Sequence, residues 1–288
     1  MTRLDAISLA RSFLFVPANR PERVAKALAS GAGAVIIDLE DAVAPDAKPA
    51  ARAQLAQAWA GFTGPEQARL VVRVNAAGTP WHLEDLQLMA NLAAEGLAGV
   101  VLPKAEAPDM LRTLAAHTGT TCALLPMVET AAGLAAIDAL ARCPRVCRLV
   151  FGNLDFQADV GMACGPDEAE LAPVRLALVL ASRRAGLVAP VDGVTAALHD
   201  TDQLRSHTAR SQRFGFGARL CIHPAQVAVV NAGLGPSAKE VDWALRVLAH
   251  QQRTGEGVFT LDERMVDAPV LKLAQRTLAL HTAAAVHH

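Results

Sequence analysis

The stretch VIIDLEDAVAPDAK, from Val35 to Lys48, begins as an apolar strand and ends in a cluster of acidic residues. Only 19% of the 288 residues are charged, yet Asp38, Glu40, Asp41 and Asp46 follow one another closely. A continuous apolar run is typical of a parallel strand that is buried on both faces. The acids at its end could be metal ligands, catalytic acids or a solvated cap of the strand.

The same alternation of a short apolar strand and an Ala/Leu-rich helix runs along the whole chain. The predicted strands are Ser12–Pro17, Ala34–Leu39, Leu70–Asn75, Gly99–Lys104, Cys122–Glu129, Arg148–Gly152, Val188–Val194 and Arg219–His223. The predicted helices include Arg20–Ala29, Pro49–Trp59, His82–Ala93, Met110–His117, Ala131–Ala141, Val174–Ala185 and Gln203–Arg213. About eight such units predict an α/β fold, a (β/α)8 TIM barrel, which typically takes ~250 residues. A doubly wound sheet is the alternative, although no Gly-x-Gly-x-x-Gly motif follows the first strand.

The composition limits the class of protein. Lys and Arg number 27 against 28 Asp and Glu, and there is no tyrosine, which argues against a nucleic-acid partner. Every longer apolar stretch carries charges, so we expect no membrane span and no membrane partner. The five cysteines form no Cys-x-x-Cys pair and no secretory segment is recognisable, so we expect reduced thiols in a cytoplasmic protein.

Most predicted strands end in polar residues, at the edge where barrel enzymes build their active sites. These residues are Asn19, Arg20, Asp38, Glu40, Asp41, Arg73, Asn75, Lys104, Glu129, Asn153, Asp155, Asp192 and His223. Each one alone is more often a structural cap. Their joint position at one edge favours an active site there.

Glu129 and Asp155 follow neighbouring strands and have no cysteine or histidine beside them. Two converging carboxylates suit Mg²⁺, which takes water and substrate oxygens as its other ligands. The alternative for Glu129 is a charge at a helix N-terminus, where the helix dipole favours it. Arg73 projects from an apolar strand and needs a partner there. That partner is either a substrate carboxylate or an acid at a strand end.

Lys104 and His223 raise two further possibilities. A Schiff-base lysine needs a desolvated pocket that lowers its pKa. The acid-rich surroundings of Lys104 would instead keep its amine protonated, which disfavours this chemistry. His223 precedes a proline and is either a base or, more often in such a position, an anchor of the loop.

Ordered motifs run along essentially the full chain. They are RSFLFVPANRPERVAKAL, GAGAVIIDLEDAVAPDAKPAAR, VLPKAE, ETAAG, FGNLDFQADVG, VDGV, IHPAQ and GEGVFTLDERMVDAPVLKLAQ. Together they closely resemble the citrate lyase β-subunit-like (CitE-like) family of the HpcH/HpaI aldolase group, kin to malyl-CoA and citramalyl-CoA lyases. The resemblance implies a Mg²⁺-dependent lyase that joins or splits an acetyl or propionyl thioester and a 2-oxo acid. Mn²⁺ is expected to substitute for Mg²⁺, and no organic cofactor is implied.

The resemblance also assigns roles to individual residues. Glu129 and Asp155 match the metal ligands, and Arg73 matches the arginine that holds the oxo acid. Asp267 matches the catalytic acid. The positions that match contacts with CoA or substrate are Phe15, Arg20, Lys26, Leu154, Ile222 and His223.

The acids of the opening stretch then take supporting roles. We expect Glu40 and Asp41 to orient metal-bound waters or to pair with Arg73 or Lys48. Asp38 is expected to brace the strand end, and Asp46 to cap the following helix.

The resemblance predicts a barrel over residues 1–235 and a C-terminal helix and lid segment over 236–288. In relatives that segment closes over the site of a neighbouring protomer, so we expect a homo-oligomer, a trimer or a multiple of it. Alternative functions are a citrate lyase β-subunit acting on an acyl carrier protein, a malyl-CoA thioesterase, or a non-catalytic assembly subunit. The last is disfavoured because Arg73, Glu129, Asp155 and Asp267 are all present.

Two segments depart from the family pattern. Gly-Phe-x-Gly-Lys is usual where this chain reads Gly215-Phe216-Gly217-Ala218-Arg219, and we expect this to alter a loop packed against the thioester. Pro173 replaces a frequent aromatic residue, while Arg175 is retained.

Overall fold

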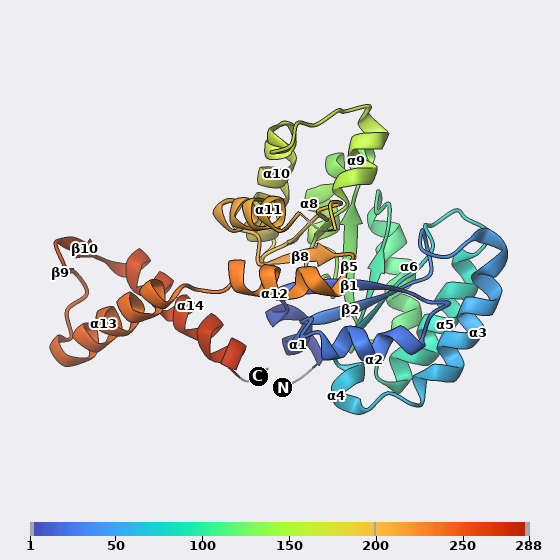
Figure 1. Ribbon diagram of the computed structural model, residues 1–288, viewed down its shortest axis with the longest axis horizontal. Helices are drawn as coiled ribbons and strands as arrows, with labels where there is room; N and C mark the ends of the chain where they lie inside the picture. Colours follow the sequence, from blue (N-terminus) through green and yellow to red (C-terminus); the bar gives the residue numbers. More distant parts are fainter. Residues whose placement is uncertain (1–2, 199, 286–288) are drawn as a thin grey trace. The chain divides into compact units, whose positions relative to one another are not determined.

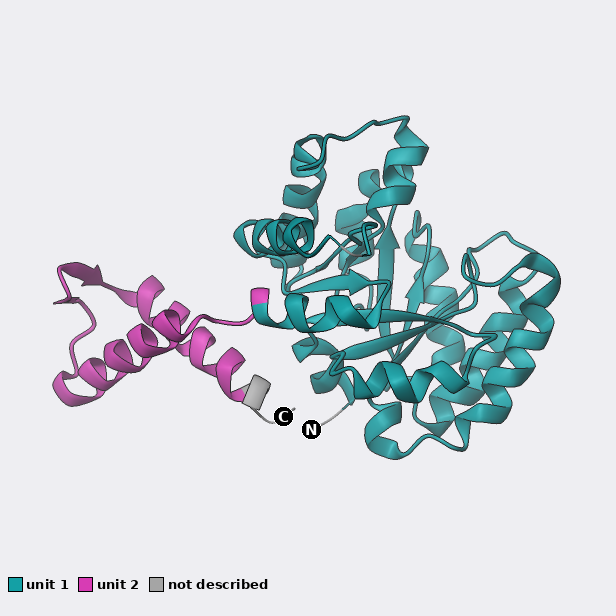
Figure 2. Ribbon diagram, in the orientation of Figure 1, with its two compact units in different colours: residues 1–232 teal, residues 233–288 magenta. Residues whose placement is uncertain are grey.

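The structure is a computed structural model that describes residues 3–198 and 200–285. The chain forms two compact units, residues 1–232 and residues 233–288 (Figure 2). The predicted boundary followed residue 235. Each unit is described by itself below.

Unit 1 is a closed barrel of eight parallel strands, as predicted (Figure 1). The strands are β1 (Ser12–Pro17), β2 (Ala34–Asp38), β3 (Leu70–Arg73), β4 (Gly99–Leu102), β5 (Ala123–Val128), β6 (Val150–Phe151), β7 (Val191–Asp192) and β8 (Ala218–Cys221). Each strand pairs with the next, and β8 pairs with β1, so the sheet has no open edge.

The strand β1 has its predicted bounds, whereas the other strands are shorter than predicted, most of all β6 and β7. Polar residues that follow these strands, such as Lys104 and Glu129, lie in the loops and not in the strands. The predicted strands Arg148–Gly152 and Val188–Val194 contract to two residues each. Few ladder bonds therefore hold this part of the barrel.

Helices cover the outside of the barrel (Figure 1). They are α1 (Arg3–Leu9), α2 (Glu22–Ala29), α3 (Lys48–Trp59), α4 (Gly64–Gln67), α5 (His82–Glu95), α6 (Pro108–Thr118), α7 (Ala131–Ala135), α8 (Ile137–Ala141), α9 (Asn153–Val160), α10 (Ala172–Arg184), α11 (Thr201–Phe214) and α12 (Pro224–Gly233), with 3-10 turns η1 (Pro45–Ala47) and η2 (Ala169–Leu171). None of the helices within the described residues combines the length and apolar character that a membrane span requires.

Two local predictions were wrong. The single helix predicted over Ala131–Ala141 is two helices, because Ala136 leaves the helical conformation at φ −88° and ψ 0°. Asp46 does not cap α3, because it lies inside η1 and the residue at the N-cap is Ala47, which makes no side-chain bond.

The interior of the barrel is apolar over most of its length. Its core cluster includes Phe13, Ala34, Ile36, Val71, Val101, Leu125, Met127, Val150, Val191, Ala218 and Leu220. The five cysteines are free thiols, as expected, and all except Cys164 are buried. This packing holds the ends of the strands, and the side chains that follow them, in fixed positions.

Unit 2 consists of helices α13 (Ala238–Thr254) and α14 (Ala268–Ala285) and a hairpin of β9 (Phe259–Leu261) and β10 (Arg264–Val266). A capping box begins α13, in which Ser237 and Glu240 each bond the other's backbone N–H. Its own core is Ala244, Val247, Phe259, Val266, Leu271 and Ala274. Unit 2 therefore has an apolar interior separate from the barrel.

Leu125 in β5 provides a test of the barrel core, because its side chain is fully buried. Leu125→Ala is expected to lower the free energy of unfolding by about 2–5 kcal/mol, through lost burial and the cavity left behind. Leu83→Ala, on α5 at 70% exposure, is the control and should change it by no more than about 0.5 kcal/mol. Urea unfolding followed by circular dichroism measures both, and equal losses would contradict the core position of Leu125.

Candidate active site at the carboxyl ends of the strands

A cavity of about 340 Å³ lies at the carboxyl ends of the barrel strands. Its lining residues are Phe15, Asp38, Asp41, Ala42, Arg73, Met127, Glu129, Gly152, Asn153, Leu154, Asp155, Val194, Leu220 and Ile222. Arg73, Glu129 and Asp155, the main candidates from the sequence, therefore meet in one place.

Arg73, the last residue of β3, is surrounded by the acids that follow β2. Its Nε and Nη2 donate to Oδ1 and Oδ2 of Asp38, each at 2.7 Å. Its Nη1 lies 3.0 Å from Oε2 of Glu40 and 3.1 Å from Oδ2 of Asp41. The sequence left two kinds of partner open for Arg73, a substrate carboxylate or an acid at a strand end, and in the structure Arg73 pairs with strand-end acids. Burial lowers the pKa of Arg73, but these acids outweigh it and raise the pKa, so the guanidinium stays charged.

The loop after β2 is braced from both sides. The carboxylate of Asp38 accepts hydrogen bonds from the backbone N–H of Glu40 and of Ala42, both at 3.0 Å, which confirms its predicted role. Lys48 is buried and its Nζ donates to the carbonyls of Leu39 and Glu40, at 2.8 and 2.6 Å. Glu40 and Asp41 pair with Arg73 as predicted, while Lys48 holds the main chain of their loop.

Lys104 contributes both its ammonium and its backbone. Its Nζ lies 2.9 Å from Oε1 of Glu40, and its backbone N–H donates to Oε1 of Glu129 at 2.8 Å. Its backbone is in the left-handed region at φ +45°, which is uncommon for a residue with a side chain. Burial lowers the pKa of Lys104, but the hydrogen bond and charge of Glu40 outweigh it and raise the pKa. A protonated amine agrees with the argument against Schiff-base chemistry.

Glu129, at the end of β5, is buried without enough partners. Its side chain is 1% exposed, and among the described residues its Oε2 has no hydrogen-bond partner. Burial, followed by the charge of Glu40, raises the pKa of Glu129 to about 8, although the Lys104 N–H opposes this rise. Thr130, and not Glu129, caps α7 by accepting the Gly133 N–H at 3.0 Å. A helix N-terminus therefore does not explain the buried carboxylate.

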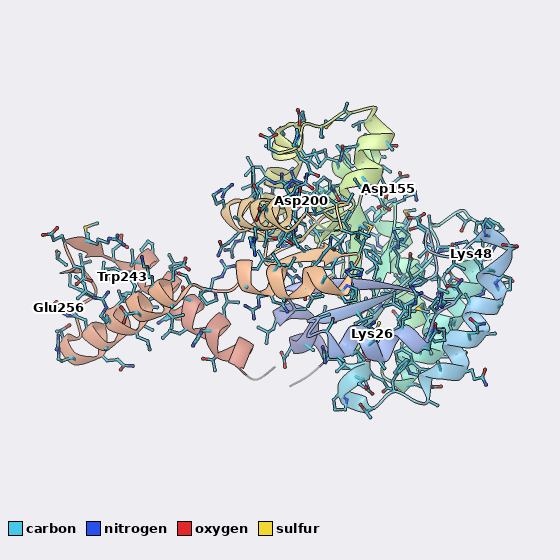
Figure 3. All side chains as sticks on the ribbon, viewed as in Figure 1. Lys26, Lys48, Asp155, Asp200, Trp243 and Glu256 are labelled. Atoms are coloured by element: carbon cyan, nitrogen blue, oxygen red, sulfur yellow. The ribbon has the colours of Figure 1, made fainter. Side chains whose placement is uncertain are left out.

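Asp155 lies in the first turn of α9, on the wall of the same cavity, and Figure 3 labels it on that helix. Its charge contributes to the raised pKa of Glu129. No group of three or more acidic, histidine or cysteine side chains in the described part of the chain is suited to hold a metal. Two carboxylates without nitrogen or sulfur ligands, one with an unpartnered oxygen, fit a Mg²⁺ ion that keeps several water or substrate oxygens.

The predicted substrate contacts divide into two groups. Phe15, Leu154 and Ile222 line the cavity, and the ring of Phe15 lies 4.9 Å from the Arg73 guanidinium carbon. Leu154 and Ile222 are 47% and 40% exposed, so they present apolar surface beside the acids.

Arg20, Lys26 and His223 lie outside the cavity lining. Arg20 is exposed and paired with Glu22 at 2.6 Å, and Lys26 is exposed in the last turn of α2 (Figure 3). Nδ1 of His223 accepts the Ala225 N–H at 3.2 Å, which favours the loop-anchor interpretation of this residue.

Asp267 belongs to unit 2, whereas Arg73, Glu129 and Asp155 belong to unit 1. Its Oδ1 accepts the Val270 N–H at 3.2 Å at the start of α14. Asp267 is thus a partly exposed cap of a helix, and its catalytic role stays a prediction.

The two residues that depart from the family pattern, Ala218 and Arg219, lie in the barrel strand β8. Both residues are fully buried in β8. Nη1 of Arg219 lies 3.1 Å from Oδ2 of Asp192, and its Nη2 donates to Thr195 at 3.0 Å. Thr195 lies in the loop after β7, so Arg219 contacts a loop as well as the barrel interior. An effect of these two residues on a loop packed against the thioester stays a prediction.

Known proteins resemble this chain over nearly its full length. The family described as HpcH/HpaI aldolase/citrate lyase matches residues 11–224. A citrate lyase subunit beta-like protein of Mycobacterium tuberculosis is 36% identical over 92% of this chain and 93% of its own length. A (3S)-malyl-CoA thioesterase of Cereibacter sphaeroides is 34% identical over 93% of each chain. The crystal structure of CitE from M. tuberculosis in complex with magnesium, acetoacetate and coenzyme A has a TM-score of 0.80 and 34% identity, and the match covers 95% of this chain and 98% of that one.

The buried carboxylate predicts a pH-dependent effect of Glu129→Gln. The folded pKa of about 8 lies above the ordinary value of 4.5. Between these two pH values the folded protein retains a proton that the unfolded chain has lost, so Glu129 reduces stability progressively as the pH rises. Glu129→Gln has no carboxyl group to titrate, so its stability does not fall in this way. A pKa that differs by one between the folded and unfolded states changes the free energy of unfolding by about 1.4 kcal/mol.

Without divalent cations, the melting temperature of Glu129→Gln should match that of the wild type near pH 5 and exceed it above pH 8. Thermal unfolding in a chelating buffer measures this difference. Asp138→Asn, which removes an exposed pair with Arg184, is the control. A difference that shrinks as the pH rises would contradict the buried charge.

Proposed function

The chain belongs to the HpcH/HpaI aldolase/citrate lyase family, and we propose that it is a Mg²⁺-dependent carbon–carbon lyase acting on CoA thioesters. The observation that carries the proposal is the unpartnered oxygen of Glu129 in the cavity that Asp155 and Arg73 also line. The M. tuberculosis CitE structures that contain magnesium with pyruvate, with oxaloacetate, or with acetoacetate and coenzyme A support it. The substrate would be a hydroxyacyl thioester of the malyl, citramalyl or citryl type, and the products an acetyl or propionyl thioester and a 2-oxo acid.

Glu129 and Asp155 would hold the cation, through the two carboxylates that share the cavity. A bound Mg²⁺ supplies polarisation of the substrate hydroxyl and of the carbonyl that forms from it. Metal binding would also keep Glu129 ionised at neutral pH, because the cation replaces the proton favoured by burial.

Arg73 would orient the oxo-acid part and stabilise the negative charge that develops during cleavage. Asp38 fixes the plane of the Arg73 guanidinium through its bonds with Nε and Nη2. The remaining nitrogen, Nη1, is the one that would exchange its partner for a substrate carboxylate. Nη1 contacts the buried Glu40 and also Asp41, whose side chain is 57% exposed and would move aside for a substrate carboxylate. Arg73 would thus keep its bonds with Asp38 while Nη1 changes its partner from Asp41 to the substrate.

Asp267 would complete the reaction by proton transfer. In cleavage the substrate hydroxyl loses its proton to water as it becomes the carbonyl of the 2-oxo acid. The electron pair of the broken carbon–carbon bond remains on the carbon next to the thioester carbonyl. The carboxylic acid of Asp267 protonates that carbon and then regains a proton from water. In the condensing direction the carboxylate removes the same proton. Phe15, Arg20 and Lys26 would bind the CoA part, since exposed cations suit its phosphates.

The family resemblance implies that the C-terminal segment, which carries Asp267, closes over the site of a neighbouring protomer. On that ground we propose that a complete site needs two protomers of a homo-oligomer, a trimer or a multiple of it. Glu129→Ala and Asp267→Asn should each be inactive alone. Mixed by reversible dissociation or co-expression, they should recover about a quarter of the wild-type activity, because random assembly restores that fraction of shared sites. Activity that is not recovered in verified mixed oligomers would contradict shared sites.

The metal assignment predicts the behaviour of Asp155→Asn and Glu129→Ala. Both variants should lose about 100-fold or more of the Mg²⁺-dependent turnover, since each removes one of two protein ligands. The assay offers acetyl-CoA or propionyl-CoA with glyoxylate, pyruvate or oxaloacetate in the presence of Mg²⁺. Asp138→Asn should retain full activity. Undiminished turnover by Glu129→Ala would refute the metal site.

The thioesterase is a second candidate because a (3S)-malyl-CoA thioesterase is among the relatives. Product analysis of malyl-CoA turnover separates the two. Free malate would indicate hydrolysis, whereas acetyl-CoA and glyoxylate would indicate the lyase. A thioester on an acyl carrier protein is the third candidate, favoured by the 30% identity to a citrate lyase subunit beta of Leuconostoc mesenteroides. It would be processed faster than the CoA ester.

A further inference from the structure

Asn153, the first residue of α9, is held by groups that come much later in the sequence. It is 1% exposed. Its Oδ1 accepts the Val194 N–H at 2.9 Å, and its Nδ2 donates to the Val194 carbonyl and to Oε1 of Glu168, both at 3.2 Å. The position of the first turn of α9 therefore depends on the loop after β7 and on Glu168.

The close approach of Asn153 to the loop after β7 requires a glycine. A Cβ on Gly193 would lie 2.1 Å from Oδ1 of Asn153, far closer than any van der Waals contact. The backbone and the side chain are thus matched to each other at this point. Such a fit indicates that the orientation of Asn153 is fixed and not one of several.

Glu168 is itself held in an unfavourable backbone conformation. Its φ of +48° lies in the left-handed region, which is uncommon for a residue with a side chain. Two arginines hold it there. Nη2 of Arg210 lies 2.7 Å from Oε2 of Glu168, Nη2 of Arg175 contacts the same oxygen, and Nη1 of Arg175 donates to the Glu168 carbonyl at 3.2 Å.

The arginines are anchored in turn within the barrel. Nε of Arg175 lies 3.1 Å from Oδ1 of Asp192 in β7, and Arg219 of β8 contacts the other oxygen of the same carboxylate. Arg175, Asp192 and Arg219 are all fully buried. Salt and solvent screen buried pairs little, so this cluster is a rigid support for Glu168.

We propose that Glu168 is a positioning residue for Asp155. Through Asn153 it sets the first turn of α9, and this turn places the Asp155 carboxylate on the cavity wall shared with Glu129. Glu168 does not line the cavity and acts on the reaction only through Asn153. The inference rests on the proposed function, in which Asp155 and Glu129 bind Mg²⁺.

The test uses the full-length protein with three variants. Asn153→Ala removes the link and leaves the arginine cluster intact, so it remains informative if Glu168→Ala fails to fold. Glu170→Gln is the matched control, because Glu170 lies in η2, two residues after Glu168, and is exposed. Its side chain accepts the Gly165 N–H at 3.2 Å and bonds Cys164.

Two measurements are made on each variant. Hydrogen–deuterium exchange without ligands should be faster than in the wild type for the peptide covering residues 153–160 in Asn153→Ala and Glu168→Ala. Calorimetric titration with MgCl2 should show about tenfold weaker binding in the same two variants, as for lost support of a metal ligand. In turnover, the Mg²⁺ concentration for half-maximal rate should rise equally while the KM for the thioester stays unchanged. Glu170→Gln should match the wild type throughout.

The outcomes separate the inference from the proposed function. If the 153–160 peptide of Asn153→Ala exchanged hydrogen at the wild-type rate, the positioning role of Glu168 would be overturned. Faster exchange with an unchanged Mg²⁺ affinity would overturn it as well. A rise in the KM for the thioester that accompanies the weaker Mg²⁺ binding would also overturn it, because it would indicate general disruption. Wild-type protein that binds no Mg²⁺ at all would overturn the proposed function, and the inference with it.

Discussion

The two parallel bonds between Arg73 and Asp38 are the interaction on which the rest of the site depends. They join the ends of β2 and β3, and they bring a charged guanidinium into a nearly water-free position. Because a buried cation needs more than one partner, the loop after β2 turns back so that Glu40 and Asp41 reach the same guanidinium. Glu40 in turn pairs with Lys104, whose backbone holds Glu129. One buried pair thus determines the arrangement of four neighbouring strand ends.

This arrangement leaves an excess of negative charge. The carboxylates of Asp38, Glu40, Asp41, Glu129 and Asp155 outnumber the cations Arg73, Lys48 and Lys104. Arg73 and Lys104 already serve the acids after β2, so the charge excess falls on Glu129 and Asp155. The raised pKa of Glu129 is the physical expression of this imbalance. A proton or a divalent cation must supply the missing charge, and the proposed lyase uses the latter.

Local pattern was enough to predict the barrel, the order of its strands and the side chains that gather at their ends. Apolar runs reveal strands, and a strand that is followed by an acid reveals which end carries the site. Contacts between distant residues were beyond such reasoning. Nothing near Asn153 in the sequence indicates that Glu168 would bond it, and the left-handed backbone of Lys104 has no local signal. The prediction that Asp46 caps α3 was wrong because Asp46 lies in a 3-10 turn that precedes this helix. The role of Asp267 rests on resemblance, since its local structure is that of an ordinary helix cap.

The two-residue strands β6 and β7 have a consequence for how this barrel can change during evolution. Few backbone bonds close the barrel between β5 and β8. Ionic side chains from β7, β8 and α10, together with the Ser211 hydroxyl of α11, take over part of that task. Replacing one member of such a cluster leaves the others buried and unpaired, so the effects of single changes do not add. Arg219, where the family usually has lysine, should therefore be inherited together with Asp192, Thr195 and Ser211 as one unit. Divergence in this wall of the barrel is expected to proceed by linked replacements.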